Sequence, residues 1–344
     1  MILKSIIIFL LIIPFKFDSG SDIKGQQPNV AIDMKGVIRM VYGEGESIYY
    51  LTSTDNGRTF SKPVLVGQLT GMHLGHTRGP QIASSKNFSI ITAITKDGNI
   101  HSFKLNHAKK IWTKLANAND KDGSAPEGLM SLAADHEDNF YATWLDIRSE
   151  KKNNLYFSSF AGKTSAWSRN ILLYKSPDEH ICECCRPNIS FNNNKLVIGF
   201  RNWFMGSRDI YYSVSTDNGK TFTTAKKSGT GTWQLNACPM DGGGLSINES
   251  GKVSTAWRRN SDVIYWSENQ PEQRIGTGRD VSMVQNKSNT LIAWQDNSTI
   301  KLMNLKNKIT IELGKGVSPR VYLLNNGKAI CVWEDSNTVR YKVI

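Results

Sequence analysis

The sequence predicts an all-β protein in which four-stranded sheets are arranged as the blades of a β-propeller. Three observations support this fold class. A unit of short strands recurs seven times, Gly- and Asn-rich turns separate the strands, and no segment has a convincing amphipathic helical pattern. A single blade cannot bury both of its faces, so neighbouring blades must stack around a central channel. We count seven units, and a ring of six blades is the alternative.

Each unit opens with a short strand that often follows Pro or Gly. We expect these first strands at residues 28–32, 80–83, 129–133, 187–191, 243–247, 281–284 and 319–323. Second and third strands follow in every unit, and the seventh unit ends the chain at its third strand. We therefore expect residues before Pro28 to supply the missing outer strand and to close the ring, because closure removes an exposed sheet edge.

An eight-residue turn motif occurs twice, at residues 53–60 and 215–222. In each copy the Asp carboxylate can accept hydrogen bonds from backbone N–H groups of its own turn. The Gly two residues later takes the positive φ that other residues resist. The structural residues of these turns are therefore Asp55, Gly57, Asp217 and Gly219.

Both turns have the pattern Ser-x-Asp-x-Gly-x-Thr-Phe and resemble the Asp-boxes of sialidases and other BNR-repeat propellers. The resemblance implies that the boxes lie at the outer rim of a blade, between its third and fourth strands, and are structural. It also implies an active site in which three arginines bind a substrate carboxylate, a Tyr paired with a Glu is the nucleophile, and an Asp is the acid/base.

The resemblance implies roles for particular residues of this chain. Catalytic roles fall to Asp146, Asp241 and Tyr322, and substrate-binding roles fall to Arg78, Arg258 and Arg320. The alternative for each arginine is a salt bridge on the surface or between blades.

A second group of residues immediately precedes the first strands, a position that forms a ring around the channel in a propeller. This group consists of Arg78, Glu127, Arg186, Asp241, Arg279 and Arg320. A ring that holds four arginines would attract an anionic ligand. We therefore add Glu127 and Arg186 to the predicted substrate-binding residues.

The least generic segment holds Cys182, Cys184 and Cys185, just before the fourth first strand. Cys238 lies at the corresponding point before the fifth, so all four cysteines are expected near one mouth of the channel. Three interpretations compete. Disulfides are the default in an exported protein, thiolates with His180 nearby suit Cu or Zn, and a reactive redox pair is the third. Cu or Zn at this cluster is the only cofactor that the sequence suggests.

Geometry limits the disulfide interpretation. A bridge between the neighbours Cys184 and Cys185 would be strained, because ordinary disulfides need Cα atoms about 4.4–6.8 Å apart. Bridges are therefore expected between Cys238 and the triplet, and within the triplet. The fifth cysteine, Cys331, lies in mid-strand and is expected to be a buried core thiol.

The N-terminus has the organisation of a secretory signal peptide. Lys4 precedes an apolar run at residues 6–14, and a polar stretch follows at residues 18–22. We expect residues 1–21 to be removed and residues 22–344 to form a single propeller domain that is secreted or periplasmic and monomeric. No later segment approaches the ~20 apolar residues of a transmembrane anchor.

The formal net charge of +12 favours anionic partners, although the Lys and Arg residues are scattered along the chain. Nucleic acid suits an exported protein poorly, whereas a glycan or another anionic small molecule suits it well. The first functional hypothesis is therefore an exo-glycosidase of the sialidase type that hydrolyses an anionic glycan. The alternative is a non-catalytic propeller that binds a ligand or a metal at a cysteine-lined mouth.

Overall fold

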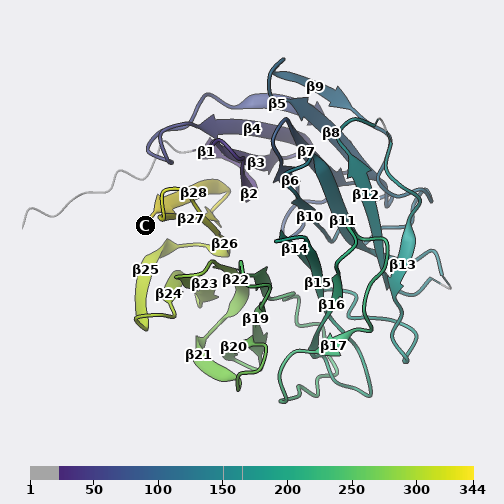
Figure 1. The fold of residues 1–344 in the computed structure, drawn as a ribbon, viewed down its shortest axis with the longest axis vertical. Coiled ribbons are helices and arrows are strands. Elements are labelled where there is room, and N and C mark those ends of the chain that lie inside the picture. The colour runs from purple at the N-terminus through teal and green to yellow at the C-terminus, as the bar shows by residue number, and fades with distance from the viewer. Residues whose placement is uncertain (1–22, 150, 165) are drawn as a thin grey trace, which may run out of the picture.

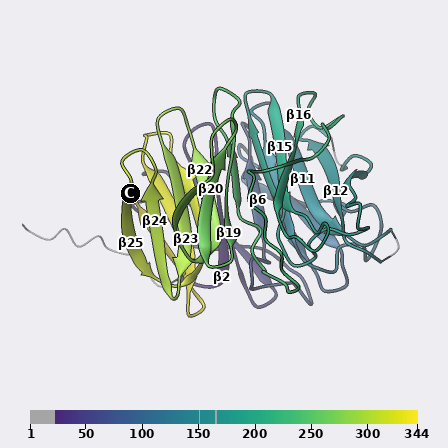
Figure 2. The same ribbon diagram turned by 90° about the horizontal axis from the view of Figure 1, so that it is seen from below.

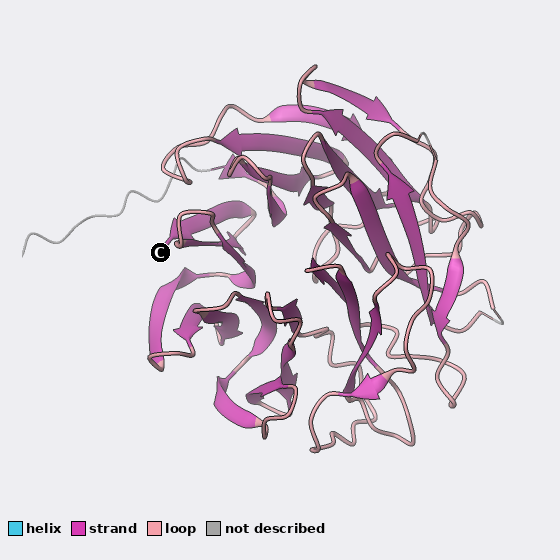
Figure 3. Ribbon diagram, viewed as in Figure 1, coloured by secondary structure: helices cyan, strands magenta, loops and turns pink. Residues whose placement is uncertain are grey.

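The computed structural model describes residues 23–149, 151–164 and 166–344 of the chain. They form seven antiparallel sheets of four strands each, which lie as blades around a common axis (Figure 1) and make a thick disc (Figure 2). The described part consists of strands and loops and contains no helix (Figure 3), so no helix in it could cross a membrane. The predicted all-β propeller is confirmed, with seven blades.

The first four blades follow one another along the chain and are each complete in themselves. Blade 1 has β2 (Gln26–Ile32), β3 (Ile38–Glu44), β4 (Ser47–Ser53) and β5 (Val64–Gln68), and blade 2 has β6 (Gln81–Ser84), β7 (Phe88–Ile94), β8 (Ile100–Asn106) and β9 (Ile111–Lys114). Blade 3 has β10 (Met130–Ala134), β11 (Asn139–Asp146), β12 (Asn154–Ala161) and β13 (Ile171–Tyr174), and blade 4 has β14 (Asn188–Asn192), β15 (Lys195–Arg201), β16 (Ile210–Ser215) and β17 (Lys226–Lys227).

The last three blades continue the pattern, and the seventh borrows a strand from the start of the chain. Blade 5 has β18 (Gly244–Ile247), β19 (Val253–Arg259), β20 (Asp262–Ser267) and β21 (Gln273–Thr277), and blade 6 has β22 (Arg279–Gln285), β23 (Thr290–Asp296), β24 (Thr299–Asn304) and β25 (Ile309–Lys315). Blade 7 has β26 (Val317–Leu323), β27 (Ala329–Asp335), β28 (Thr338–Val343) and β1 (Ile23–Lys24).

The first strand of each blade lies nearest the axis, and the fourth lies at the outer rim (Figure 1). The core is made between blades, because each sheet covers the apolar face of its neighbour. Val41 and Ile48 of blade 1, for example, pack in one cluster with Ile91 and Phe103 of blade 2. This stacking fixes the first strands side by side, so residues at their starts meet at one mouth of the channel.

The ring closes through the N-terminal segment, as predicted. Strand β1 pairs with β28 and completes blade 7. Side chains reinforce the closure, because the Glu334 carboxylate accepts hydrogen bonds from Gln26 Nε2 at 3.0 Å and from the backbone N–H and Nε2 of Gln27 at 3.2 and 3.1 Å. Glu334 and Gln27 are both buried.

Glu334→Ala is therefore expected to lower the free energy of unfolding by about 3 kcal/mol, because buried N–H groups of Gln27 lose their acceptor. Urea unfolding of the purified protein measures this change. Glu312→Ala is the matched control, since Glu312 is an exposed residue of β25. Equal stabilities of the two variants would show that these bonds do not hold the ring closed.

The two Ser-x-Asp-x-Gly turns lie between the third and fourth strands of blades 1 and 4. The Asp55 carboxylate accepts hydrogen bonds from the backbone N–H and the hydroxyl of Thr59 at 3.0 and 2.6 Å, and these bonds lower the pKa of Asp55 to about 2. Gly57 has a φ of 84°, and a Cβ there would lie 2.7 Å from Val343 of blade 7. The second turn repeats this arrangement with Asp217 and Gly219. Each turn therefore packs against the preceding blade.

The predicted signal peptide, residues 1–21, lies outside the described residues. Its removal and the export of the protein stay predictions.

Candidate functional site

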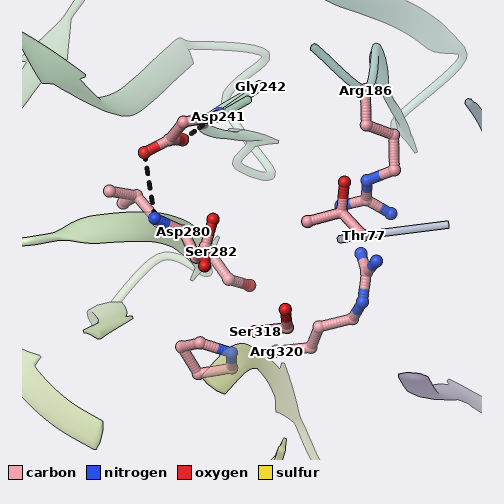
Figure 4. Close-up of a pocket in the computed structure, with 11 residues that line it drawn as sticks. Thr77, Arg186, Asp241, Gly242, Asp280, Ser282, Ser318 and Arg320 are labelled. Carbon is pink, nitrogen blue, oxygen red and sulfur yellow. Dashed lines mark hydrogen bonds between the residues drawn. The ribbon is translucent and has the colours of Figure 1, made fainter. Parts of the chain in front are cut away.

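One mouth of the channel forms a pocket, here called the mouth pocket. Segments from blades 2, 4, 5, 6 and 7 line it, and its residues are Thr77, Arg186, Asp241, Gly242, Gly243, Asp280, Val281, Ser282, Ser318, Pro319 and Arg320 (Figure 4). An adjoining lobe shares Asp280 and Ser318 and adds Gln27, His76, Met240 and Arg279 among others. Most of these residues lie at the start of a first strand, the position that the sequence predicted for a binding site.

The backbone around this mouth is strained. Six non-glycine residues of the pocket and its lobe have left-handed φ values: Gln27 (52°), His76 (52°), Thr77 (66°), Met240 (51°), Asp280 (52°) and Ser318 (54°). Gln27, Asp280 and Ser318 lie at bulges where β2, β22 and β26 begin. The left-handed conformation costs a non-glycine residue roughly 1–2 kcal/mol, and such strain concentrates at functional sites.

Arg186 and Arg320 supply the positive charge of the mouth pocket, and their guanidinium groups point toward one another (Figure 4). Arg320 is 7% exposed, and Arg186 donates a hydrogen bond to Gln81 Oε1 at 3.0 Å. Burial lowers the pKa of both, and for Arg186 the charge of Arg320 adds to the effect. The ion pairs found among the described residues involve neither side chain. Arg320, which is buried, and Arg186, which is partly buried, therefore face the pocket without an ion pair, and the charge of Asp280 offsets only part of the cost of burying Arg320.

Two carboxyl groups lie on the other side of the pocket. Asp241 is 1% exposed, and its two oxygens accept hydrogen bonds from the backbone N–H groups of Gly243 at 3.0 Å and Asp280 at 2.9 Å. Asp280 Oδ2 lies 3.5 Å from Arg279 Nε. Burial, followed by the charge of Asp241, raises the pKa of Asp280 to about 6. A carboxyl that titrates near pH 6 can donate and recover a proton close to neutrality.

Tyr322 lies in the channel behind the arginines. Its hydroxyl donates to Asn29 Oδ1 at 3.1 Å, and Asn29 Nδ2 donates to Gln81 Oε1 at 2.8 Å. Gln81 also accepts the hydrogen bond from Arg186, so one hydrogen-bonded chain crosses the channel from blade 7 to blade 4. Burial raises the pKa of Tyr322, and the charges of Arg320 and Arg186 oppose the rise.

The pocket thus brings together three of the predicted residues, Arg186, Asp241 and Arg320. Arg78 and Glu127 instead contact one another, through an Arg78 Nε bond to the Glu127 carbonyl at 2.5 Å and an ion pair at 3.6 Å. This is the salt bridge between blades that was the alternative for the arginines.

Arg258 and Asp146 also lie outside the residues that line the mouth pocket. Arg258 stacks 5.6 Å above the ring of Trp233 and donates to the Asn260 carbonyl at 2.6 Å. Asp146 is fully buried, accepts a hydrogen bond from Trp144 Nε1 at 2.8 Å, and pairs with Arg148 at 2.9 Å. Its contacts are those of a residue that holds blade 3 together.

Sequence reasoning missed Asp280, Thr77 and Ser318. A usable signal was present for two of them. Gly278 and Gly316 each stand two residues before the left-handed residue, Asp280 or Ser318, and Gly25 stands in the same relation to Gln27. In this Gly-x-x pattern the third residue lies at the bulge and lines the mouth of the channel.

The predicted cysteine cluster forms beside the mouth. The Sγ atoms of Cys182, Cys184 and Cys185 are separated by 3.7 Å (182 to 184), 3.1 Å (182 to 185) and 3.9 Å (184 to 185), and the three residues are buried. Cys238 is exposed, and all five cysteines have free thiols. The predicted disulfides are therefore not formed in this structure and stay a prediction. Cys331 is fully buried in another cluster, which spans blades 6 and 7.

Positive charge surrounds the three sulfur atoms. Arg208 Nη1 donates to Cys182 Sγ at 3.0 Å. Burial raises the pKa of Cys182, but hydrogen bonds from Cys184 and Cys185 and the charges of Arg201 and Arg208 outweigh it and hold that pKa well below the usual value. A group of three sulfur donors within 4.8 Å of one another can hold a metal ion.

His180, predicted as a metal-ligating neighbour, is not part of that group. Its ring stacks on Trp203 at 6.0 Å, and its Nδ1 lies 3.8 Å from Glu183.

Fold and site together define a seven-bladed β-propeller with a pocket at one mouth of its channel that two arginines and two aspartates line. The chain matches no known family model and no curated protein sequence. It is similar in structure to the BP39L lectin of Burkholderia pseudomallei, with a TM-score of 0.61 and 9% identity over 94% of this chain and 96% of that one.

Two carbohydrate-active enzymes are similar as well. An ulvan lyase solved bound to -[GlcA(1-4)Rha3S]- has a TM-score of 0.57 and 9% identity over 95% of both chains. The α-L-arabinanase of Penicillium chrysogenum, solved with arabinobiose, has a TM-score of 0.55 and 12% identity over 95% of this chain and 98% of that one. Identities this low show a shared propeller fold.

Proposed function

We propose that the protein is an exported glycan-processing enzyme that binds the acid group of an anionic sugar in the mouth pocket and hydrolyses the adjacent glycosidic bond. The observation that carries the proposal is the pair Arg186 and Arg320, one guanidinium group partly buried and the other buried, which face the pocket and form no ion pair among the described residues. Guanidinium groups bind carboxylates and sulfates through paired hydrogen bonds. The sugar's acid group would supply the missing negative charge.

The chemistry assigned to this pocket follows from the neighbouring groups. Asp280, with a pKa of about 6, is the proposed proton donor to the leaving oxygen, and Asp241 positions it by accepting its backbone N–H. Tyr322 lies two residues from Arg320 on β26, so the two side chains share a face of the strand, and it is the proposed nucleophile of a sialidase-type mechanism. Propellers that act on or bind glycans, such as the ulvan lyase and the lectin, support a carbohydrate ligand.

A second candidate, binding without turnover, is favoured by the partner of Tyr322. Its hydroxyl donates to the amide oxygen of Asn29, whereas activation of a phenol needs a base that can take the proton. In this alternative Tyr322, Asn29 and Gln81 hold Arg186 in place and the pocket recognises an anionic sugar.

Fluorogenic aryl glycosides of sialic acid and glucuronic acid, assayed between pH 4 and 8, test the proposed activity. Turnover that is abolished in Tyr322→Phe supports the hydrolase. Absence of turnover, together with a thermal shift produced by the corresponding free sugar acids, supports the binding protein and overturns the enzyme. Sequencing the N-terminus of the protein recovered from the culture medium or periplasm tests export, and a start near residue 22 is expected.

A further inference from the structure

We propose that Cys182, Cys184 and Cys185 form a binding site for a single Cu(I) ion beside the mouth pocket, with Met240 packed against it. The site is separate from the proposed glycan chemistry and does not depend on it. It rests on the placement of three thiols, on a thioether in contact with them, and on the charges around them.

Two of the three sulfur–sulfur separations already match a trigonal metal site. Ligand sulfur atoms about 2.3 Å from a central ion stand about 4 Å from one another in a planar trigonal arrangement. The separations of 3.7 and 3.9 Å from Cys184 match this value, and the 3.1 Å between Cys182 and Cys185 must open by about 1 Å. A tight turn at residues 183–185 holds the three side chains on one side of the loop.

The donor set favours Cu(I). Soft thiolate and thioether ligands select Cu(I), and Met240 packs directly against the three cysteines. Structural zinc sites are almost always four-coordinate with Cys, His or carboxylate ligands. The group of donors within 4.8 Å contains three such ligands and no His or carboxylate among the described residues.

Surrounding charges suit an anionic metal–thiolate centre. Arg208 donates to Cys182 Sγ at 3.0 Å. Arg201 is 1% exposed and directs its guanidinium to three backbone carbonyls, those of Asp241, Arg208 and Arg258. The sulfur of Cys182, the cysteine on which the charge of Arg201 acts to favour the thiolate, is a counter-charge for this buried cation, because a buried charge needs an opposite charge nearby. Glu183 is partly exposed and brings a carboxylate oxygen to 3.5 Å from Arg208 Nη1.

Competition for Cu(I) tests the site. The reduced, metal-free protein is titrated anaerobically with Cu(I) against bathocuproine disulfonate, and X-ray absorption reports the ligands. We expect one Cu(I) per chain with three sulfur ligands, and protection of the three cysteines from alkylation by iodoacetamide in the wild-type protein. Cys184→Ser should weaken Cu(I) binding at least 100-fold, whereas Cys331→Ala, which removes a buried thiol elsewhere, should leave it unchanged.

Other variants separate this site from its competitors. Cys238→Ser should retain Cu(I) binding with three sulfur ligands, because Cys238 is exposed and lies outside the group of three, although its thiol interacts with that of Cys184. Preferential binding of Zn(II) that is lost in Cys238→Ser would overturn the three-coordinate Cu(I) site in favour of a four-cysteine zinc site. Isolation of the exported protein with a Cys182–Cys185 disulfide and without copper would overturn it in favour of a disulfide. Protection of the three cysteines from alkylation is measured on the wild-type protein. It therefore tests Cu(I) binding even if Cys184→Ser does not fold.

Discussion

Arg320→Gln is expected to weaken binding of an anionic sugar about 100-fold and at the same time to raise the stability of the ligand-free protein. The loss of binding follows because one charged hydrogen bond is worth about 1.5–3 kcal/mol and 1.4 kcal/mol is a tenfold change in affinity. The gain in stability follows because Arg320 is buried and faces Arg186, and because burial lowers its pKa by more than the charges of Tyr322 and Asp280 raise it. Burying such a charge opposes folding.

Isothermal titration with N-acetylneuraminic acid and glucuronic acid measures the affinity, and thermal unfolding without ligand measures the stability. Arg274→Gln is the matched control, since Arg274 is exposed and pairs with Asp262 on the surface. It should change neither quantity by a large amount. A less stable Arg320→Gln protein with undiminished affinity would show that Arg320 serves the fold and that the ligand binds elsewhere.

The fold was predictable because its signals are local and repeated. The two Ser-x-Asp-x-Gly turns, the strand pattern of each unit and the absence of a fourth strand from the seventh unit are all visible in the sequence. Ring closure by β1 followed from that absence, since an unpaired edge at β28 would be exposed. The same repetition also placed Arg186, Asp241 and Arg320 at corresponding points of blades 4, 5 and 7.

Charge pairing across blades could not be predicted in the same way. Arg78 and Glu127 occupy the predicted ring, yet they neutralise one another, while Arg186 and Arg320 do not meet a carboxylate. Whether an arginine pairs depends on its distance from carboxylates on other blades, and the sequence of one blade does not give that distance. Asp280 was missed for a related reason. A bulge with a left-handed residue turns it into the pocket beside Arg279, against the two-residue alternation of a regular strand.

Asp280→Asn is expected to lower kcat/KM about 100- to 1000-fold near pH 5, because an amide cannot donate the proton that a positioned carboxylic acid supplies. In the wild-type protein the acid form is the active one, so kcat/KM should fall as the pH rises through about 6, the pKa that burial and Asp241 give to Asp280. A pH–rate profile of the wild-type protein measures this limb, and Asp262→Asn, which changes an exposed carboxylate, should leave it in place.

Stability gives an independent readout of the same group. A carboxyl whose pKa is higher in the folded than in the unfolded state stabilises the fold at low pH, and this contribution is lost as the pH rises from about 4 through 6. Asp280→Asn should therefore be more stable than the wild-type protein above pH 6 and should lack this part of the pH dependence. Urea unfolding at pH 4, 5, 6 and 7 compares the two. Identical pH dependence in both proteins would mean that the pKa of Asp280 is the same in the folded and unfolded states, so that this carboxyl is ionised near neutrality and the proposed mechanism loses its proton donor.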